Sequence, residues 1–95
     1  MSYYYDRKGN VISREGWQHL WSTPEYKRIA ETHIGEVWVS TVWLGLNHNF
    51  IGTPPMIFET MVFGGEHDQD IDRYSTEEAA VLGHIRMVDL VKRSE

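Results

Sequence analysis

The stretch VWVSTVWLGL, residues 37–46, decides the fold, because its run of β-branched and aromatic residues predicts a long β-strand. A second stretch, residues 55–63 (PMIFETMVF), predicts another strand, which Gly64 and Gly65 close. Both stretches carry apolar side chains at odd and at even positions, whereas a sheet with one solvated face alternates apolar and polar residues. We therefore expect both faces of the sheet to be covered, either by helices on opposite sides or by helices on one side and a second subunit on the other.

The N-terminal part of the chain predicts a short hairpin and one short helix. Residues 3–12 predict two short strands around a turn in which Gly9 supplies a positive φ. Ser13 is a favourable N-cap, and the apolar residues that follow it fall on one helical face. Residues 23–27 begin with Thr-Pro, which suits the start of one further helical turn.

Two more strands and a long helix complete the predicted fold. Residues 29–34 predict a strand joined by a tight turn to the central one, and residues 71–74 predict a short edge strand. A helix is expected over residues 76–92, with Ser75 as N-cap and Glu78 completing a capping box. The predicted fold is α+β: one domain over residues 1–95, with an antiparallel meander sheet of three to four strands, one short N-terminal helix and one longer C-terminal helix.

The composition is that of a small, mildly acidic globular domain. The chain has 95 residues, 41% of them hydrophobic, and a formal charge of −5. It contains no cysteine, which excludes disulfides, thiolate nucleophiles and cysteine metal sites and favours a reducing compartment. No apolar run approaches the roughly 18 residues that a membrane span needs, and no signal peptide is evident, so we expect no membrane partner.

The negative charge is concentrated in one part of the chain. Residues 59–78 hold seven acids and one base, a charge of −6, and the remaining seven acids and eight bases give +1. Such a region repels phosphate, so we expect no nucleic-acid partner. The acidic segment, residues 66–78, is a solvated loop, a contact surface for a basic protein, or a surface that imitates DNA.

Glu59 is the polar residue with the most informative position. It lies within an apolar strand, where a functional carboxylate acts as a general base or as a polar anchor in a pocket. A structural carboxylate there instead lies at a sheet end or pairs with His33, Arg28 or a hydroxyl. His48 lies in the loop between the two strands and could line a cleft with Glu59. These residues define a candidate ligand pocket.

Trp38 and Trp43 are candidate contact residues, because they lie on opposite faces of the central strand and are large apolar groups. The histidine and carboxylate spacings match neither a zinc motif nor a calcium loop. No catalytic triad can be assembled from the sequence. We therefore expect no metal, no cofactor and no catalytic residue.

Gly83 and His84 occur together in the predicted C-terminal helix. A lone histidine on an apolar stripe is most often a core or interface residue. A glycine inside a helix costs about 1 kcal/mol relative to alanine, which suggests that another backbone or an aromatic ring approaches closely at this point.

Four segments form a distinctive pattern over most of the chain: Tyr4-Tyr5-Asp6 with Gly9-Asn10, residues 40–48 (STVWLGLNH), residues 57–65 (IFETMVFGG), and residues 73–79 (RYSTEEA) followed by Gly83-His84. In these segments the chain resembles a family of small uncharacterised proteins from actinobacteriophages, the mycobacteriophages and their relatives. The resemblance implies a phage origin and a host-cell cytoplasm. It implies no chemistry, because no activity is established for that family.

Three functions fit these observations. The leading one is a small non-enzymatic phage accessory protein that binds another protein, such as a host factor, through the sheet face or the acidic segment. The second is a small enzyme or ligand-binding domain with a pocket near Glu59 and His48. The third is a structural or assembly role as a homodimer.

Overall fold

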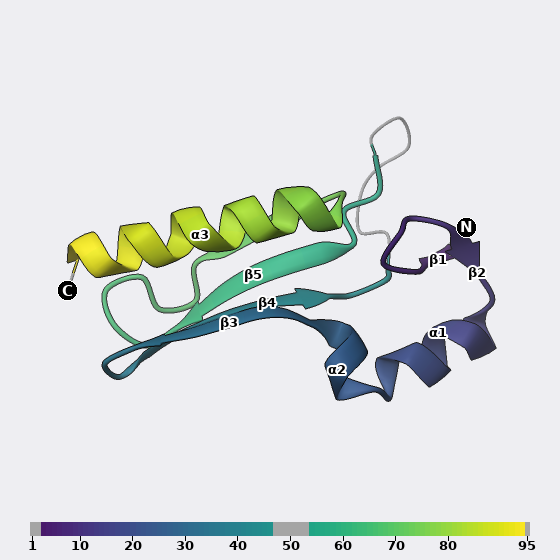
Figure 1. Ribbon diagram of the computed structural model, residues 1–95, viewed down its shortest axis with the longest axis horizontal. Coiled ribbons are helices and arrows are strands. Elements are labelled where there is room, and N and C mark those ends of the chain that lie inside the picture. The colour runs from purple at the N-terminus through teal and green to yellow at the C-terminus, as the bar shows by residue number, and fades with distance from the viewer. Residues whose placement is uncertain (1–2, 47–53, 95) are drawn as a thin grey trace.

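The computed structural model describes residues 3–46 and 54–94 and has an α+β fold (Figure 1). A hairpin of β1 (Tyr4–Tyr5) and β2 (Val11–Ile12) leads into two short helices, α1 (Arg14–Trp21) and α2 (Pro24–Lys27). The four strands of the main sheet follow, and then a long helix: β3 (Arg28–Ile34), β4 (Val37–Trp43), β5 (Phe58–Phe63), β6 (Ile71–Tyr74) and α3 (Glu77–Ser94). The sheet is an antiparallel meander in the order β3-β4-β5-β6, which confirms the predicted fold class.

The two central strands are shorter than predicted, because the chain leaves the sheet after Trp43. The backbone N–H groups of Leu44 and Gly45 both donate to the Ile57 carbonyl, at 2.7 and 3.3 Å, so the regular ladder stops there. Gly45 has a φ of +71°, and a side chain on it would overlap the rings of Trp17 and Trp43. β5 accordingly begins at Phe58.

One face of the sheet is covered by α3. The residues buried on this side of β4 and β5 are Val37, Val39, Thr41, Trp43, Phe58, Thr60 and Val62. The helix turns its small or apolar residues Ala80, Gly83 and Val91 toward them, and all three are buried. β-branched side chains in the strands and small ones in the helix let the two layers approach closely, and the core forms between them.

Gly83 lies where α3 packs tightly against Tyr74 of the sheet. A Cβ on this residue would overlap the ring and hydroxyl of Tyr74, which lies at the end of β6 and is 6% exposed. The prediction that an aromatic ring or a backbone crowds this glycine is confirmed. Only glycine leaves room for the Tyr74 ring beneath the helix.

A cluster of aromatic rings joins the N-terminal segment to the sheet. The Trp43 indole donates to the Tyr5 carbonyl at 3.0 Å, and the Trp17 indole donates to the Leu44 carbonyl at 2.9 Å. The Tyr26 ring meets Trp43 edge-on, with 4.9 Å between the ring centroids. These contacts hold the hairpin, α1 and α2 beyond one end of the sheet (Figure 1).

The predicted start of the C-terminal helix is wrong by one residue. The Thr76 hydroxyl accepts from the Ala79 N–H at 3.1 Å, so Thr76 rather than Ser75 provides the cap. The residue three positions beyond Thr76 is Ala79, and the predicted capping box of Ser75 and Glu78 therefore does not form.

The second face of the sheet carries no helix in the described residues. Of the two predicted arrangements, the one with helices on opposite sides is not observed, because the aromatic cluster draws α1 and α2 past the end of β4 instead of across the strands. We call this uncovered side the open face. A second subunit on it stays a prediction.

Candidate interaction surface

The open face begins with a row of three stacked rings across β3, β4 and β5. Strand register places His33 opposite Trp38 and Trp38 opposite Phe63. The His33 and Trp38 rings are parallel within 4°, with centroids 5.9 Å apart, and Trp38 stacks on Phe63 at 4.8 Å. Cross-strand ring pairs of this kind stabilise a sheet. They also form a rigid apolar ridge at one end of the open face.

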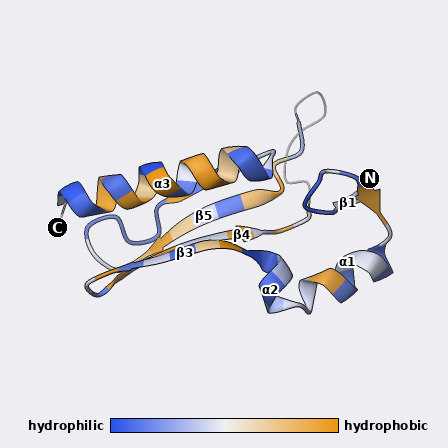
Figure 2. Ribbon diagram, viewed as in Figure 1, coloured by the Kyte–Doolittle hydropathy of each residue, from blue (hydrophilic) through white to orange (hydrophobic). Residues whose placement is uncertain are grey.

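A second row continues the apolar surface toward β6. Register aligns Glu31, Ser40, Met61 and Ile71 across the four strands. Ile71 is 47% exposed and Phe63 is 38% exposed, values far above those of their neighbours on the α3 side. In Figure 2, β5 is coloured mostly as hydrophobic, with one hydrophilic stretch. The open face therefore exposes apolar side chains to solvent.

Charged side chains on the open face pair with one another. Arg73 donates to Glu59 at 3.0 Å across β5 and β6, and the Glu59 side chain is only 15% exposed. On β3, Glu31 lies 3.3 Å from Arg28 and 3.6 Å from the His33 ring. Each acid on the face thus has a basic neighbour. The open face carries little net charge, although the chain as a whole carries −5.

Glu59 forms the structural pair that the sequence allows, but with a different partner. The sequence predicts His33, Arg28 or a hydroxyl as the partner, whereas the register of β6 brings Arg73 directly opposite Glu59. Arginine beside a carboxylate satisfies its charge without a ligand. This pairing leaves Glu59 a less suitable general base.

A shallow pocket of about 250 Å³ borders the open face where α2 meets the sheet. It is lined by residues from α2, β3 and β4: Pro24, Lys27, Arg28, Glu31, Trp38, Ser40 and Val42. The Trp38 indole N–H is buried and has no hydrogen-bond acceptor among the described residues. Trp38 therefore contributes apolar area at this point rather than a polar anchor.

The five predicted binding residues separate into two groups. His33, Trp38 and Glu59 lie together on the open face. Trp43 lies on the other side of β4, fully buried in the core. His48 lies outside the described residues, so the predicted cleft between His48 and Glu59 is not tested.

Sequence reasoning missed Phe63 and Ile71 as surface residues. Both are large, apolar and exposed on the open face. The signal that could have found them is strand parity, since Phe63 shares the parity of Glu59 and Met61 in the predicted strand. Because Glu59 is charged, the face of the strand that it shares with Phe63 is the face expected to meet solvent.

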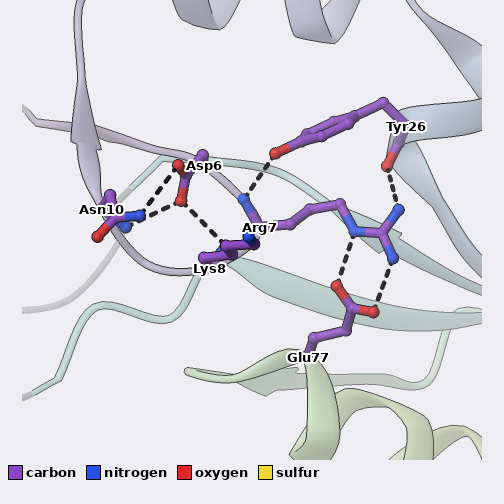
Figure 3. A pocket seen from close by; sticks show the side chains of 6 residues that line it. All are labelled: Asp6, Arg7, Lys8, Asn10, Tyr26 and Glu77. Carbon is purple, nitrogen blue, oxygen red and sulfur yellow. Dashed lines mark hydrogen bonds and ion pairs between the residues drawn. The ribbon is translucent and has the colours of Figure 1, made fainter.

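A second pocket, of about 570 Å³, lies where the N-terminal hairpin meets α3 (Figure 3). Arg7 donates twice to Glu77, at 2.7 Å in each bond, and also donates to the Tyr26 carbonyl at 3.2 Å. The Asp6 carboxylate accepts from the backbone N–H groups of Lys8 and Asn10, each at 2.9 Å. These groups satisfy one another, so the cluster fastens the hairpin to α3.

The ion pair between Arg7 and Glu77 also shifts the pKa values of both side chains. The hydrogen bonds from Arg7 lower the pKa of Glu77, and the Glu77 carboxylate raises the pKa of Arg7. Both charges are therefore retained near neutral pH. This is the behaviour of a structural clamp.

His84 is a core residue, as predicted. Its ring nitrogens lie 2.8 Å from the hydroxyls of Thr32 and Thr41, and Thr41 is hydrogen-bonded in turn to Thr60. Burial lowers the pKa of His84, so the ring is neutral in the folded protein at neutral pH. The chain of hydroxyls satisfies the ring inside the core.

The acidic segment is folded back on itself. Asp68 accepts from the Gly64 N–H at 2.6 Å, and Asp70 lies 2.9 Å from the His67 ring. The other His67 nitrogen lies 2.8 Å from the Ser94 hydroxyl at the end of α3. These contacts use part of the negative charge to fix the loop between β5 and β6. They support the solvated-loop interpretation over a recognition surface.

Neither a metal-ligand cluster nor a membrane-spanning helix occurs in the described residues, 3–46 and 54–94. No group of three or more histidine, aspartate or glutamate side chains there is arranged to hold a metal ion. No helix in that part of the chain has the length and hydrophobicity to cross a membrane.

The comparisons with known proteins add no assignment. No family model matches the chain, and no curated protein and no solved structure matches it. The resemblance to small actinobacteriophage proteins therefore stays a prediction. The open face, formed by residues of all four strands, is the candidate functional site.

Proposed function

We propose that this chain is a small non-enzymatic protein-binding domain, and that the open face is its contact surface. The observation that carries the proposal is the combination of exposed apolar side chains with charges paired on the same face. Protein interfaces combine apolar area with aromatic anchors and a polar rim. The phage accessory role and the host-protein partner belong to this proposal and rest on the sequence resemblance.

The anchor of the surface is Trp38, held between His33 and Phe63. A ring fixed by its neighbours loses little side-chain freedom on binding, which favours tight contact. Tryptophan is also the residue type that most often dominates binding energy. Small molecules bind in deep cavities, whereas this row of rings is bordered only by a shallow pocket, so a protein partner fits it better than a small molecule does.

The enzyme alternative has less support. The Glu59 carboxylate is hydrogen-bonded to Arg73. In the larger pocket, between the N-terminal hairpin and α3, Arg7 and Glu77 are hydrogen-bonded to each other. A ligand pocket that includes His48 stays a prediction, because that residue lies outside the described part of the chain.

The experiment compares capture of proteins from an actinobacterial lysate by the wild type and by Ile71→Lys. Ile71 is exposed on the open face, so a charge there disturbs binding without opening the core. The matched control is Val11→Lys, which places the same charge on an exposed strand residue, 62% exposed, in the N-terminal hairpin. We expect the specific partner to be lost with Ile71→Lys and retained with Val11→Lys.

Equal capture by both variants would exclude the open face as the contact surface. A specific small molecule retained by the purified wild type, and lost on substitution of Glu59, would support the ligand-binding alternative instead. Circular dichroism of both variants establishes that each remains folded.

A further inference from the structure

A second apolar surface lies on α3, on the side turned away from the sheet. It consists of Val81, Leu82 and Ile85, which are 40%, 52% and 59% exposed. These positions are three and four residues apart, so they form one patch on the helix, which we call the α3 patch. Figure 1 shows α3 lying over the sheet with its outer side free of the other labelled elements.

Charged residues extend this patch in both directions. Glu78, Ile85 and Lys92 are spaced seven residues apart, which is about two helical turns, so they follow one stripe. All three are exposed. The stripe is acidic at its N-terminal end, apolar at its centre and basic at its C-terminal end.

When a second copy of α3 runs in the opposite direction, the acidic end of each stripe meets the basic end of the other. If two copies of α3 pack antiparallel about Ile85, Glu78 of each copy lies opposite Lys92 of the partner subunit. The contact therefore contains two equivalent ion pairs around an apolar centre, as a two-fold symmetric interface requires. Asp89, which also lies on this side, is already paired with Arg93 at 3.0 Å.

We propose that a second copy of this chain docks on the α3 patch, with the two α3 helices antiparallel and Ile85 at the two-fold axis. The antiparallel arrangement also opposes the two helix dipoles favourably. The layers of the dimer are sheet, helix, helix and sheet. Each open face then points outward, and the dimer presents two of them.

This proposal is independent of the function proposed for the open face. The arrangement explains how an exposed apolar patch on α3 is removed from water while the open face stays available. Two outward faces would let one dimer engage two sites on a repetitive or dimeric target. The gain in avidity comes from linking the sites and needs no new contact.

Sedimentation velocity over a concentration series tests the proposal on the full chain. The wild type is expected to shift from the mass of one chain to that of two as concentration rises. Ile85→Lys is expected to remain a single chain. Ile71→Lys, on the open face, is expected to dimerise as the wild type does.

Charge exchange tests the antiparallel register. Glu78→Lys alone and Lys92→Glu alone each replace two attractive pairs by two repulsive ones, and each should weaken self-association about tenfold. An equal mixture of the two variants should recover association, because the mixed dimer restores an acid opposite a base in both pairs. Higher salt should weaken the wild-type dimer and the mixed dimer alike.

Three outcomes would overturn the proposal. The first is a wild type that keeps the mass of one chain at every concentration. The second is a dimer that Ile71→Lys dissociates and Ile85→Lys leaves intact, which would assign the interface to the open face. The third is a mixture of the two charge variants that associates no better than either alone.

Discussion

Replacement of Gly83 by alanine probes the contact between α3 and Tyr74. Alanine normally stabilises a helix by about 1 kcal/mol relative to glycine. In this chain the added Cβ would overlap three atoms of Tyr74, Cε1, Cζ and the hydroxyl oxygen, at separations well inside the 3.0 Å that real Cβ contacts do not cross. Tyr74 is buried, so its ring can shift only if its neighbours in the core move with it.

The expected magnitude follows from these two opposing effects. Overpacking a core costs roughly 1 to 3 kcal/mol, and the simultaneous overlap with three atoms places this site at the upper end. Subtracting about 1 kcal/mol of helix propensity leaves a net loss of about 2 kcal/mol. With an m-value of about 1.5 kcal/mol per M, the urea midpoint falls by about 1.3 M.

A double-mutant cycle isolates the cause. In a Tyr74→Leu background the ring atoms are gone, so Gly83→Ala is expected to stabilise the chain by about 1 kcal/mol instead of destabilising it. Urea denaturation of the four proteins, followed by tryptophan fluorescence, measures both changes. An equal cost of Gly83→Ala in the two backgrounds would refute the close-contact explanation.

Two further predictions concern titration and the N-terminal clamp. Burial holds the pKa of His84 below its unfolded value of about 6.5, so the unfolded chain binds the proton first and stability falls as pH drops below that value. This one group lowers the free energy of unfolding by at most about 1.4 kcal/mol per pH unit. Urea titrations between about pH 7 and 5 should show that the free energy of unfolding depends less steeply on pH for His84→Gln than for the wild type. An equal pH dependence in the two proteins would contradict the assignment. Arg7→Met is expected to lower stability by about 1 kcal/mol because it removes a two-point but partly exposed ion pair, whereas Lys8→Met should change it little. The pKa of Glu77 is lowered from 4.5, so in the wild type this contribution is present above 4.5 and is lost as pH falls through the lower folded value. Thermal denaturation over a pH series descending from 7 should therefore show the difference between Arg7→Met and the wild type shrinking once pH drops below 4.5, and a difference that stays constant throughout would contradict the ion pair.

Sequence patterns predicted the elements and the meander because each pattern is local. The odd and even positions of residues 37–46 and 56–63 point to opposite faces of the sheet, and the glycine in the last helix indicates a close approach. Parity does not say which of two apolar faces a helix will cover. That choice depends on the fit between the small residues Ala80 and Gly83 and the ring of Tyr74, which is a long-range contact.

The candidate surface was predicted in part for the same reason. His33, Trp38 and Glu59 were identified from residue type and position, and the structure brings them onto one face. The partner of Glu59 was wrong because it depends on the register between β5 and β6. The loop between those strands has no regular pattern from which that register could be read.

The pairing of β3 with β4 shifts register between Arg28 and Ala30, which marks a β-bulge in β3. This bulge affects how the chain behaves when it is concentrated. β3 is an edge strand, and an unbroken edge offers its backbone as a template on which a neighbouring molecule can add a strand. The irregular spacing interrupts that template, and the charged side chains of Arg28 and Glu31 make further strand addition unfavourable. The molecule can therefore keep exposed apolar area for recognition and still resist fibre growth along its edge.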